Sequence, residues 1–247
     1  MLNMIKMELY RFFRSSSTWK ILIADAAIAV LSVILVYTMK DNTSITVYSN
    51  AGEMLTAQIN GGMLMIVCAV FVIVFVSAEY RDGFIKNIAG CLPCRGMLIL
   101  SEAVVIAAAC VLYLSAFFGC IMVVGAIAFE NSFIAVSASA IIKLLTVQII
   151  LHWGFGCLIL LFYILSQSTM LSMGIGILMA YKILNILYTL IERFFNYKID
   201  RYMLDFNIFQ LGIKAEVSMY ARAALVGITS VIIEIALSIL VIQKKDI

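Results

Sequence analysis

The sequence predicts an all-α, polytopic membrane protein with about six transmembrane helices, an N-terminal interfacial helix and short external helices before the last span. Of its 247 residues, 64% are hydrophobic and 13% are charged, whereas soluble domains carry about 45–50% apolar and roughly 25% charged residues. Several apolar runs reach the length of about 18 residues that a helix needs to cross a bilayer. The runs do not alternate apolar and polar residues, so they do not fit a transmembrane barrel. Each span must therefore close its own backbone hydrogen bonds as a helix.

The first 19 residues predict an amphipathic helix on the membrane surface. Leu2, Ile5 and Leu9 recur at helical spacing, whereas Lys6 and Arg14 fall on another face. Such a helix lies in the headgroup plane with its basic face toward anionic lipid; the alternative is a simple positively charged anchor. The run Ser-Ser-Ser-Thr that follows is expected to end this helix and to cap the first span through its hydroxyl groups.

Six apolar segments are expected to span the membrane as one transmembrane domain that covers residues 1–247. Basic residues crowd the N-terminal segment, the loop after the second span and the C-terminus. Because Lys and Arg collect on the cytoplasmic flanks of spans, both termini are expected in the cytoplasm. The predicted spans are residues 21–38, 57–78, 97–128, 141–165, 170–190 and 223–242.

Residues 191–222 are expected to form an external loop. The segment is too charged to span the membrane, yet six aromatic residues lie between positions 194 and 209. Aromatic rings favour the bilayer interface. The segment therefore predicts short external helices that touch the outer leaflet, in preference to a disordered linker.

Residues 79–96 form a compact charged segment between two long apolar runs. It contains the only proline of the chain, Pro93, and the pair Cys91 and Cys94. Redox pairs of this spacing normally lie at a helix start within a βαβ pattern, which is absent here. A metal site would need two more ligands, and the only histidine, His152, lies in the fourth predicted span. His152 is expected to bond a backbone carbonyl or to face the membrane interface rather than to relay protons, and the two cysteines are expected to be small residues in a turn.

The first half of this segment predicts a short, stiff helix. Phe84 and Ile88 share one helical face, and Lys86 projects from another. The Asp82 carboxylate can accept the free N–H groups at the helix start. Such an element suits the transfer of force from a soluble partner, and the alternative is a plain solvated loop.

The motif Glu-Tyr-x-x-Gly-Phe-Ile-Lys-Asn, which begins at Glu79, leads to a family resemblance. With this motif, a basic N-terminal helix and six spans, the chain resembles the permease subunits of ABC-2 type ABC transporters. The likeness is closest to the small bacterial permeases of lantibiotic-immunity and antimicrobial-peptide transport systems. It covers nearly the whole chain in layout, but only the N-terminal segment and residues 79–87 in local sequence. One departure is that relatives often have a basic residue where the third span begins, and Ser101 and Glu102 stand there instead.

The resemblance implies a coupling loop at residues 79–96 on the cytoplasmic side. The N-terminal helix would be the elbow helix, and residues 84–88 would form a coupling helix seated in a groove of a separate ATPase subunit. A second permease, identical or homologous, would complete the path in the bacterial cytoplasmic membrane. The residues implied for ATPase docking are Glu79, Asp82, Gly83, Phe84, Ile85, Lys86, Asn87 and Ile88.

The chain itself carries no usual ATP-binding motif. No glycine is followed by lysine, so the phosphate-binding loop GxxxxGK[ST] is absent, as are HExxH and GxSxG. We therefore expect a transport subunit that is not an enzyme and holds no cofactor, with ATP and Mg²⁺ on the partner. The net charge of +3 is too small to suggest nucleic acid. The resemblance alone implies the cargo: antimicrobial peptides, or other amphipathic or lipid-like molecules, moved out of the cell or membrane for export or immunity.

Lys182 is the most informative charge inside a predicted span, where a charge costs roughly 2.5–3.5 kcal/mol. Lys182, Asn185 and Thr189 form a stripe at i, i+3 and i+7, which is expected to face another helix, a dimer seam or a wet cavity. Candidate counter-charges are Glu234 and Asp25, and a structural ion pair is weighed equally with the lining of a substrate path. The alternative function is a stand-alone ion-coupled transporter or channel that uses these charges. Such transporters usually contain inverted repeats, and the two halves of this chain show no convincing similarity.

Overall fold

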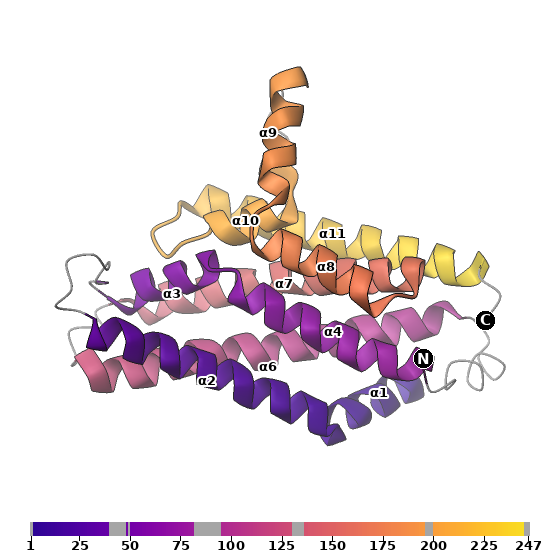
Figure 1. Ribbon diagram of the computed structural model, residues 1–247, viewed down its shortest axis with the longest axis horizontal. Coiled ribbons are helices and arrows are strands. Elements are labelled where there is room, and N and C mark those ends of the chain that lie inside the picture. Colours follow the sequence, from indigo (N-terminus) through magenta and orange to yellow (C-terminus); the bar gives the residue numbers. More distant parts are fainter. Residues whose placement is uncertain are drawn as a thin grey trace.

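The computed structural model describes residues 2–39, 48, 50–81, 95–129, 136–195 and 200–244, without the side chains of Arg81 and Phe195. Within these ranges the chain forms ten α-helices, one 3-10 helix and no strand, which confirms the all-α prediction. Five of the described helices are long and apolar enough to cross a membrane, or six if the bent pair α8–α9 counts as one span. The chain is therefore a multi-pass membrane protein whose long helices run lengthwise in one bundle (Figure 1).

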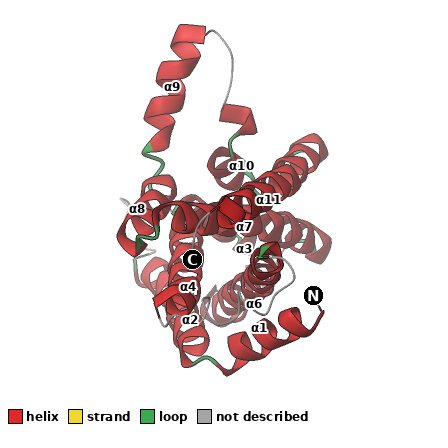
Figure 2. Cartoon of the chain, turned by 90° about the vertical axis from the view of Figure 1, so that its right-hand side faces the viewer, coloured by secondary structure: helices red, strands yellow, loops and turns green. Residues whose placement is uncertain are grey.

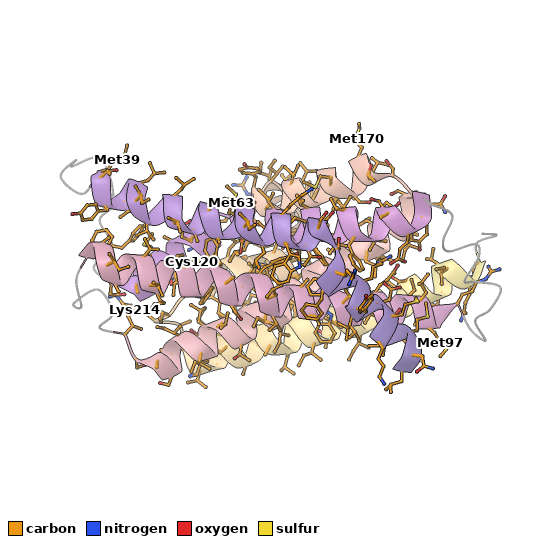
Figure 3. All side chains as sticks on the ribbon, turned by 90° about the horizontal axis from the view of Figure 1, so that it is seen from below. Met39, Met63, Met97, Cys120, Met170 and Lys214 are labelled. Atoms are coloured by element: carbon orange, nitrogen blue, oxygen red, sulfur yellow. The ribbon has the colours of Figure 1, made fainter. Side chains whose placement is uncertain are left out.

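The bundle has two distinct ends. Both chain termini lie at one end (Figure 1), which we call the terminal end. Met97, at the start of α6, lies at the terminal end, whereas Met39 and Lys214 lie at the opposite, far end (Figure 3). The charge pattern predicts both termini on one side of the membrane, and both lie at the same end of the bundle.

The first two helices meet at a serine break. Helix α1 (Leu2–Arg14) turns its Met4, Glu8 and Phe12 inward and packs on α6. The Ser15 side chain caps α2 (Ser16–Thr38) by accepting a hydrogen bond of 3.3 Å from Ser17 N. The predicted N-terminal helix and its hydroxyl cap are confirmed, but the inward face carries Met4, Glu8 and Phe12, whereas Leu2 of the predicted apolar face is exposed.

The predicted second span, residues 57–78, is interrupted in the structure. It divides into α3 (Ala51–Asn60) and α4 (Met63–Arg81), because Gly62 adopts a left-handed φ of 72°. A Cβ at Gly62 would collide with the carbonyl of Ala180, the last residue of α8. The membrane-spanning part of this segment is therefore α4 alone, and α3 is a separate helix at the far end.

Three long helices form the centre of the bundle: α6 (Gly96–Phe129), α7 (Ala138–Ser166) and α11 (Val217–Lys244). Helices α7 and α11 form the most extensive helix pair. Their backbones approach closely at Gly154 and Gly227, since a Cβ at Gly154 would lie 3.3 Å from the Gly227 carbonyl oxygen. Small residues permit this kind of close packing between helices in a membrane.

The predicted fifth span, residues 170–190, is not a continuous helix. Helix α8 (Thr169–Ala180) ends at Tyr181, and α9 (Leu184–Phe195) leaves it at an angle of 68°. The break is at Lys182, whose φ of 59° is left-handed. As a result, α9 projects away from the bundle (Figures 1 and 2).

The segment after α9 is helical where the structure describes it. The 3-10 helix η2 (Asp200–Tyr202) precedes α10 (Leu204–Gln210). Short helices before the last span are thus confirmed, but α10 is buried against α7, α11 and α3 instead of resting on a leaflet. It is held there because the Gln148 side chain of α7 donates a 3.0 Å hydrogen bond to the Ile208 carbonyl.

Candidate functional site

Three buried carboxylates meet one arginine at the terminal end of the bundle. Glu8 and Arg11 come from α1, Glu79 from the last turn of α4 and Glu102 from the second turn of α6. Glu8 and Glu102 are 0% exposed and Glu79 is 1% exposed. We call Glu8, Glu79, Glu102 and Arg11 the carboxylate cluster.

The amphipathic pattern of α1 delivers Glu8 to this cluster. Met4, Glu8 and Phe12 are four residues apart and share one helical face. The Phe12 ring packs edge-on against Phe71 of α4, with 5.5 Å between the ring centroids. This aromatic contact fixes α1 on α4 and turns the Glu8 carboxylate toward the interior.

Arg11 connects two of the carboxylates. Its Nη2 atom lies 3.1 Å from Glu8 Oε2 and also forms an ion pair with Glu79. The guanidinium carbon lies 3.8 Å from the centre of the Phe75 ring, in a cation–π contact. The Arg11 side chain is 29% exposed, so the cluster is closed on the inside but reaches the surface through this residue.

Glu79 is the central carboxylate of the three. Its side chain lies within hydrogen-bonding reach of both Glu8 and Glu102. The neighbouring Tyr80 hydroxyl is buried and accepts or donates no hydrogen bond among the described residues. The three carboxylates therefore join three helices at a place that water does not reach.

Burial dominates the electrostatics of Glu8, the member of the cluster that lies on α1. Desolvation raises the pKa of Glu8, and the Arg11 guanidinium opposes this shift without cancelling it. A carboxyl group in such a place is easier to protonate than one in water. The arrangement offers no nucleophile, but it can hold protons and resist the separation of α1, α4 and α6.

The predicted docking residues lie mostly outside the described residues. Asp82, Gly83, Phe84, Ile85, Lys86, Asn87 and Ile88 all fall there, as do Cys91, Pro93 and Cys94. Glu79 is described, and its carboxylate lies inside the cluster and not on the surface. Helix α4 ends at Arg81 and α6 begins at Gly96, so the cluster borders both ends of the predicted coupling loop.

The polar stripe of the sequence is only partly a stripe in the structure. Asn185 and Thr189 share α9 and line a cavity of about 110 Å³ with Tyr188, Glu192, Asp200 and Phe206. Lys182 lies outside the helix, in the break between α8 and α9, so the predicted spacing of i, i+3 and i+7 does not apply to it. Its Nζ atom lies 4.3 Å from the centre of the Phe209 ring in α10.

The candidate counter-charges are not next to Lys182. Glu234 lies in α11 near Cys157 of α7, and Asp25 lies in α2 near Tyr113 of α6. Both side chains are buried, and neither forms an ion pair with Lys182 within the described ranges. The charges that an ion-coupled mechanism would use are thus separated within the described ranges, and the lining of a substrate path by Lys182 stays a prediction.

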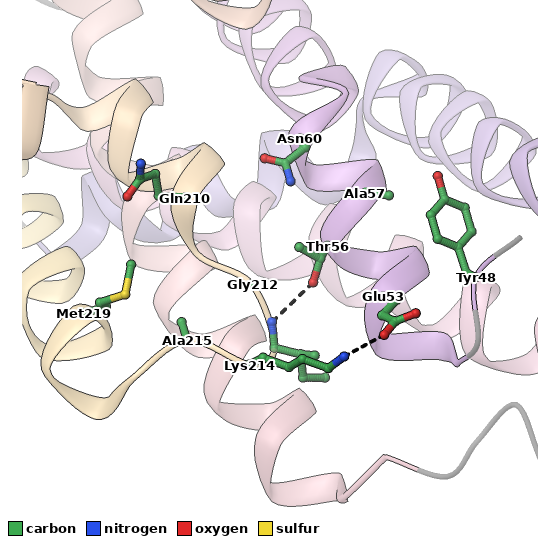
Figure 4. A pocket seen from close by; sticks show the side chains of 11 residues that line it. Tyr48, Glu53, Thr56, Ala57, Asn60, Gln210, Gly212, Lys214, Ala215 and Met219 are labelled. Carbon is green, nitrogen blue, oxygen red and sulfur yellow. Dashed lines mark hydrogen bonds and ion pairs between the residues drawn. The ribbon is translucent and has the colours of Figure 1, made fainter. Parts of the chain in front are cut away.

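A larger cavity, of about 510 Å³, opens at the far end between α3 and the segment after α10 (Figure 4). Lys214 Nζ lies 2.7 Å from Glu53 Oε1, and Ile213 N donates a 3.2 Å hydrogen bond to Thr56 Oγ1. These contacts join α3 to the segment between α10 and α11. No sequence pattern predicts this cavity, because Thr56 and Ile213 on its two walls are 157 residues apart in the chain.

The described cysteines are free thiols in or near the core. Cys68 Sγ lies 3.8 Å from Cys110 Sγ, which is a contact and not a disulfide. In the part of the chain that the structure describes, no group of three His, Cys, Asp or Glu side chains is placed to hold a metal ion. His152 Nδ1 lies 2.8 Å from the Gln148 carbonyl oxygen, which confirms the predicted bond to a backbone carbonyl.

The carboxylate cluster itself was not predicted. Sequence reasoning noted Glu102 only as a departure from the resemblance, and it did not connect Glu8 or Arg11 with α4. Two signals were available: Glu8 and Arg11 are three residues apart on one helical face, and Glu102 is an isolated acid in a long apolar span. An isolated charge in a span needs a partner, but the sequence does not say which.

Comparison with protein-family models and with curated protein sequences finds no match for this chain.

Proposed function

We propose that this chain is the membrane-spanning permease subunit of an ATP-driven exporter of the ABC-2 type. It provides the path through the bacterial cytoplasmic membrane, with both termini in the cytoplasm. A separate ATPase subunit binds ATP and Mg²⁺ and docks on residues 82–88, and a second permease completes the path. The cargo is an antimicrobial peptide or another amphipathic or lipid-like molecule, which leaves toward the outer leaflet or the medium.

The observation that supports this proposal best is the position of the carboxylate cluster. It ties α1 to the last turn of α4 and to the second turn of α6, the two helices that flank the predicted coupling loop. Breaking a buried ion pair by removing one partner costs about 3–5 kcal/mol. A push on the loop is therefore passed to α1, α4 and α6 together, and is not absorbed by the sliding of one helix.

The two helix breaks supply places where the spans can rearrange. Gly62, between α3 and α4, lies directly against Ala180 at the end of α8. Discontinuous helices are common in transporters, where unwound backbone lies inside the protein instead of facing lipid. Movement of α4 would therefore displace the end of α8, next to the α8–α9 break.

The test is co-purification of the chain with the products of its neighbouring genes. We expect an ATPase to be retained by the wild-type chain, and to be lost after deletion of residues 84–88 or after Lys86→Glu. Lys214→Glu is the matched control, because Lys214 is 78% exposed at the far end, and it should retain the ATPase. The proposal is wrong if no ATPase associates with the wild-type chain, or if the isolated chain moves cargo without nucleotide hydrolysis.

A further inference from the structure

The carboxylate cluster contains more acid than base. Among the described side chains three carboxylates face one guanidinium, and the other described titratable groups at the site are the hydroxyls of Tyr80 and Tyr163, whose rings lie 5.3 Å apart. If all three carboxylates were ionised, these groups would carry a net charge of −2. Like charges side by side in a buried site repel strongly, because the low dielectric of the interior does not screen them.

The hydrogen bonding of the three carboxylates is also incomplete. Apart from Arg11, no described N–H or O–H donor reaches the buried oxygens of Glu8, Glu79 or Glu102. Nevertheless, Glu79 lies within hydrogen-bonding reach of Glu8 on one side and of Glu102 on the other. Two ionised carboxylates cannot bond to each other, since neither carries a proton. Each added proton would create one O–H donor between two neighbouring carboxyl groups.

We propose that Glu8, Glu79 and Glu102 hold two protons between them, one on each side of Glu79, and that these protons are taken up as α1, α4 and α6 pack together. With two protons and the Arg11 guanidinium, the cluster is electrically neutral, and the three carboxyl groups form a continuous chain of hydrogen bonds. Glu8 is the only one of the three on α1, so the proton next to it is shared only while α1 is docked. This inference concerns the isolated chain and does not rest on the proposed function.

The expected effect of pH follows from the direction of proton uptake. Burial raises the pKa of Glu8 above the ordinary carboxyl value of about 4.3. The folded chain therefore binds a proton that the unfolded chain releases, and folded stability falls as pH rises above that ordinary value. The stabilising effect is complete at lower pH and is lost on the alkaline side.

The experiment measures the unfolding equilibrium of the full chain in mixed detergent micelles by titration with a denaturing detergent, at several pH values between about 5 and 8. Each proton taken up on folding changes the unfolding equilibrium constant by about tenfold per pH unit. Glu102→Gln and Glu8→Gln each remove one shared proton, so each should lower the pH dependence by about tenfold per unit. The other buried acids, Asp25, Asp205 and Glu234, remain in every variant and cancel in the comparison. Glu53→Gln, at the far end, is the control and should leave the pH dependence unchanged.

Infrared spectroscopy gives a second measurement, because a protonated carboxyl group has its own C=O stretching band. At neutral pH this band should be weaker in Glu102→Gln than in the wild-type chain or in Glu53→Gln. If Glu102→Gln does not fold, Glu8→Gln decides the question, since Glu8 lies on the surface helix and outside the spans. The proposal is overturned if the folded glutamine variants show the same pH dependence and the same band as the wild-type chain.

Discussion

At the scale of single residues, Arg11 contributes more than its position on a surface helix suggests. It contacts carboxylates from α1 and α4 and covers the Phe75 ring of α4. These contacts partly desolvate the guanidinium, and a desolvated charge is costly to leave without its partner. Arg11 is therefore the side chain on which the attachment of α1 depends most.

We expect Arg11→Gln to destabilise the folded chain by about 3–5 kcal/mol at pH 8, because a buried carboxylate loses its partner. The loss should be smaller at pH 5, where that carboxylate is protonated instead. Unfolding in mixed micelles measures both values. Lys214→Gln breaks an exposed ion pair and should cost about 0–1 kcal/mol. Equal effects of the two substitutions would show that the cluster does not hold α1 in place.

At the scale of elements, the two breaks in otherwise apolar segments depend on each other. The α3–α4 break needs the left-handed φ of Gly62, and the α8–α9 break needs the left-handed φ of Lys182. Gly62 lies against the carbonyl of Ala180, so the end of α8 occupies the space that a side chain at position 62 would need. The two breaks form one junction between α3–α4 and α8–α9.

Gly62→Ala should destabilise the chain by about 1–3 kcal/mol, because it combines a strained backbone with a clash against α8. Gly174→Ala is a matched control within α8, since a Cβ there meets no atom within 4 Å and the residue is helical. It should be neutral or slightly stabilising. Thermal unfolding of the two purified variants measures both effects. A Gly62→Ala chain as stable as Gly174→Ala would mean that the junction is not rigid.

At the scale of the whole molecule, the bundle separates its two kinds of site. The carboxylate cluster and the chain termini lie at the terminal end, whereas the 510 Å³ cavity and the Glu53–Lys214 ion pair lie at the far end. The proposed export function requires such a separation, because work would be received on one side of the membrane and cargo released on the other.

Cysteine labelling tests the orientation of the bundle. In a chain without its native cysteines, Lys214→Cys should react with a membrane-impermeant maleimide in intact cells. Lys244→Cys should react only after lysis, since Lys244 is exposed at the terminal end. The reverse pattern would place residues 82–88 outside the cell and exclude docking of a cytoplasmic ATPase.

The sequence by itself determined the membrane class, the long spans and the surface helix with its serine cap. These features depend on local composition and periodicity, because a bilayer selects helices by their length and their apolar surface. Only the tertiary structure decided which residues meet. Glu8 and Glu102 are more than 90 residues apart in the chain, Glu79 lies between them, and no periodicity connects the three. The breaks at Gly62 and Lys182 were not predicted, because each lies within an apolar run that looks like one continuous helix. The contact between Gly62 and the end of α8 exists only in the folded chain. Local composition and periodicity determine the structure of each segment, whereas close packing between distant segments determines which side chains share a site.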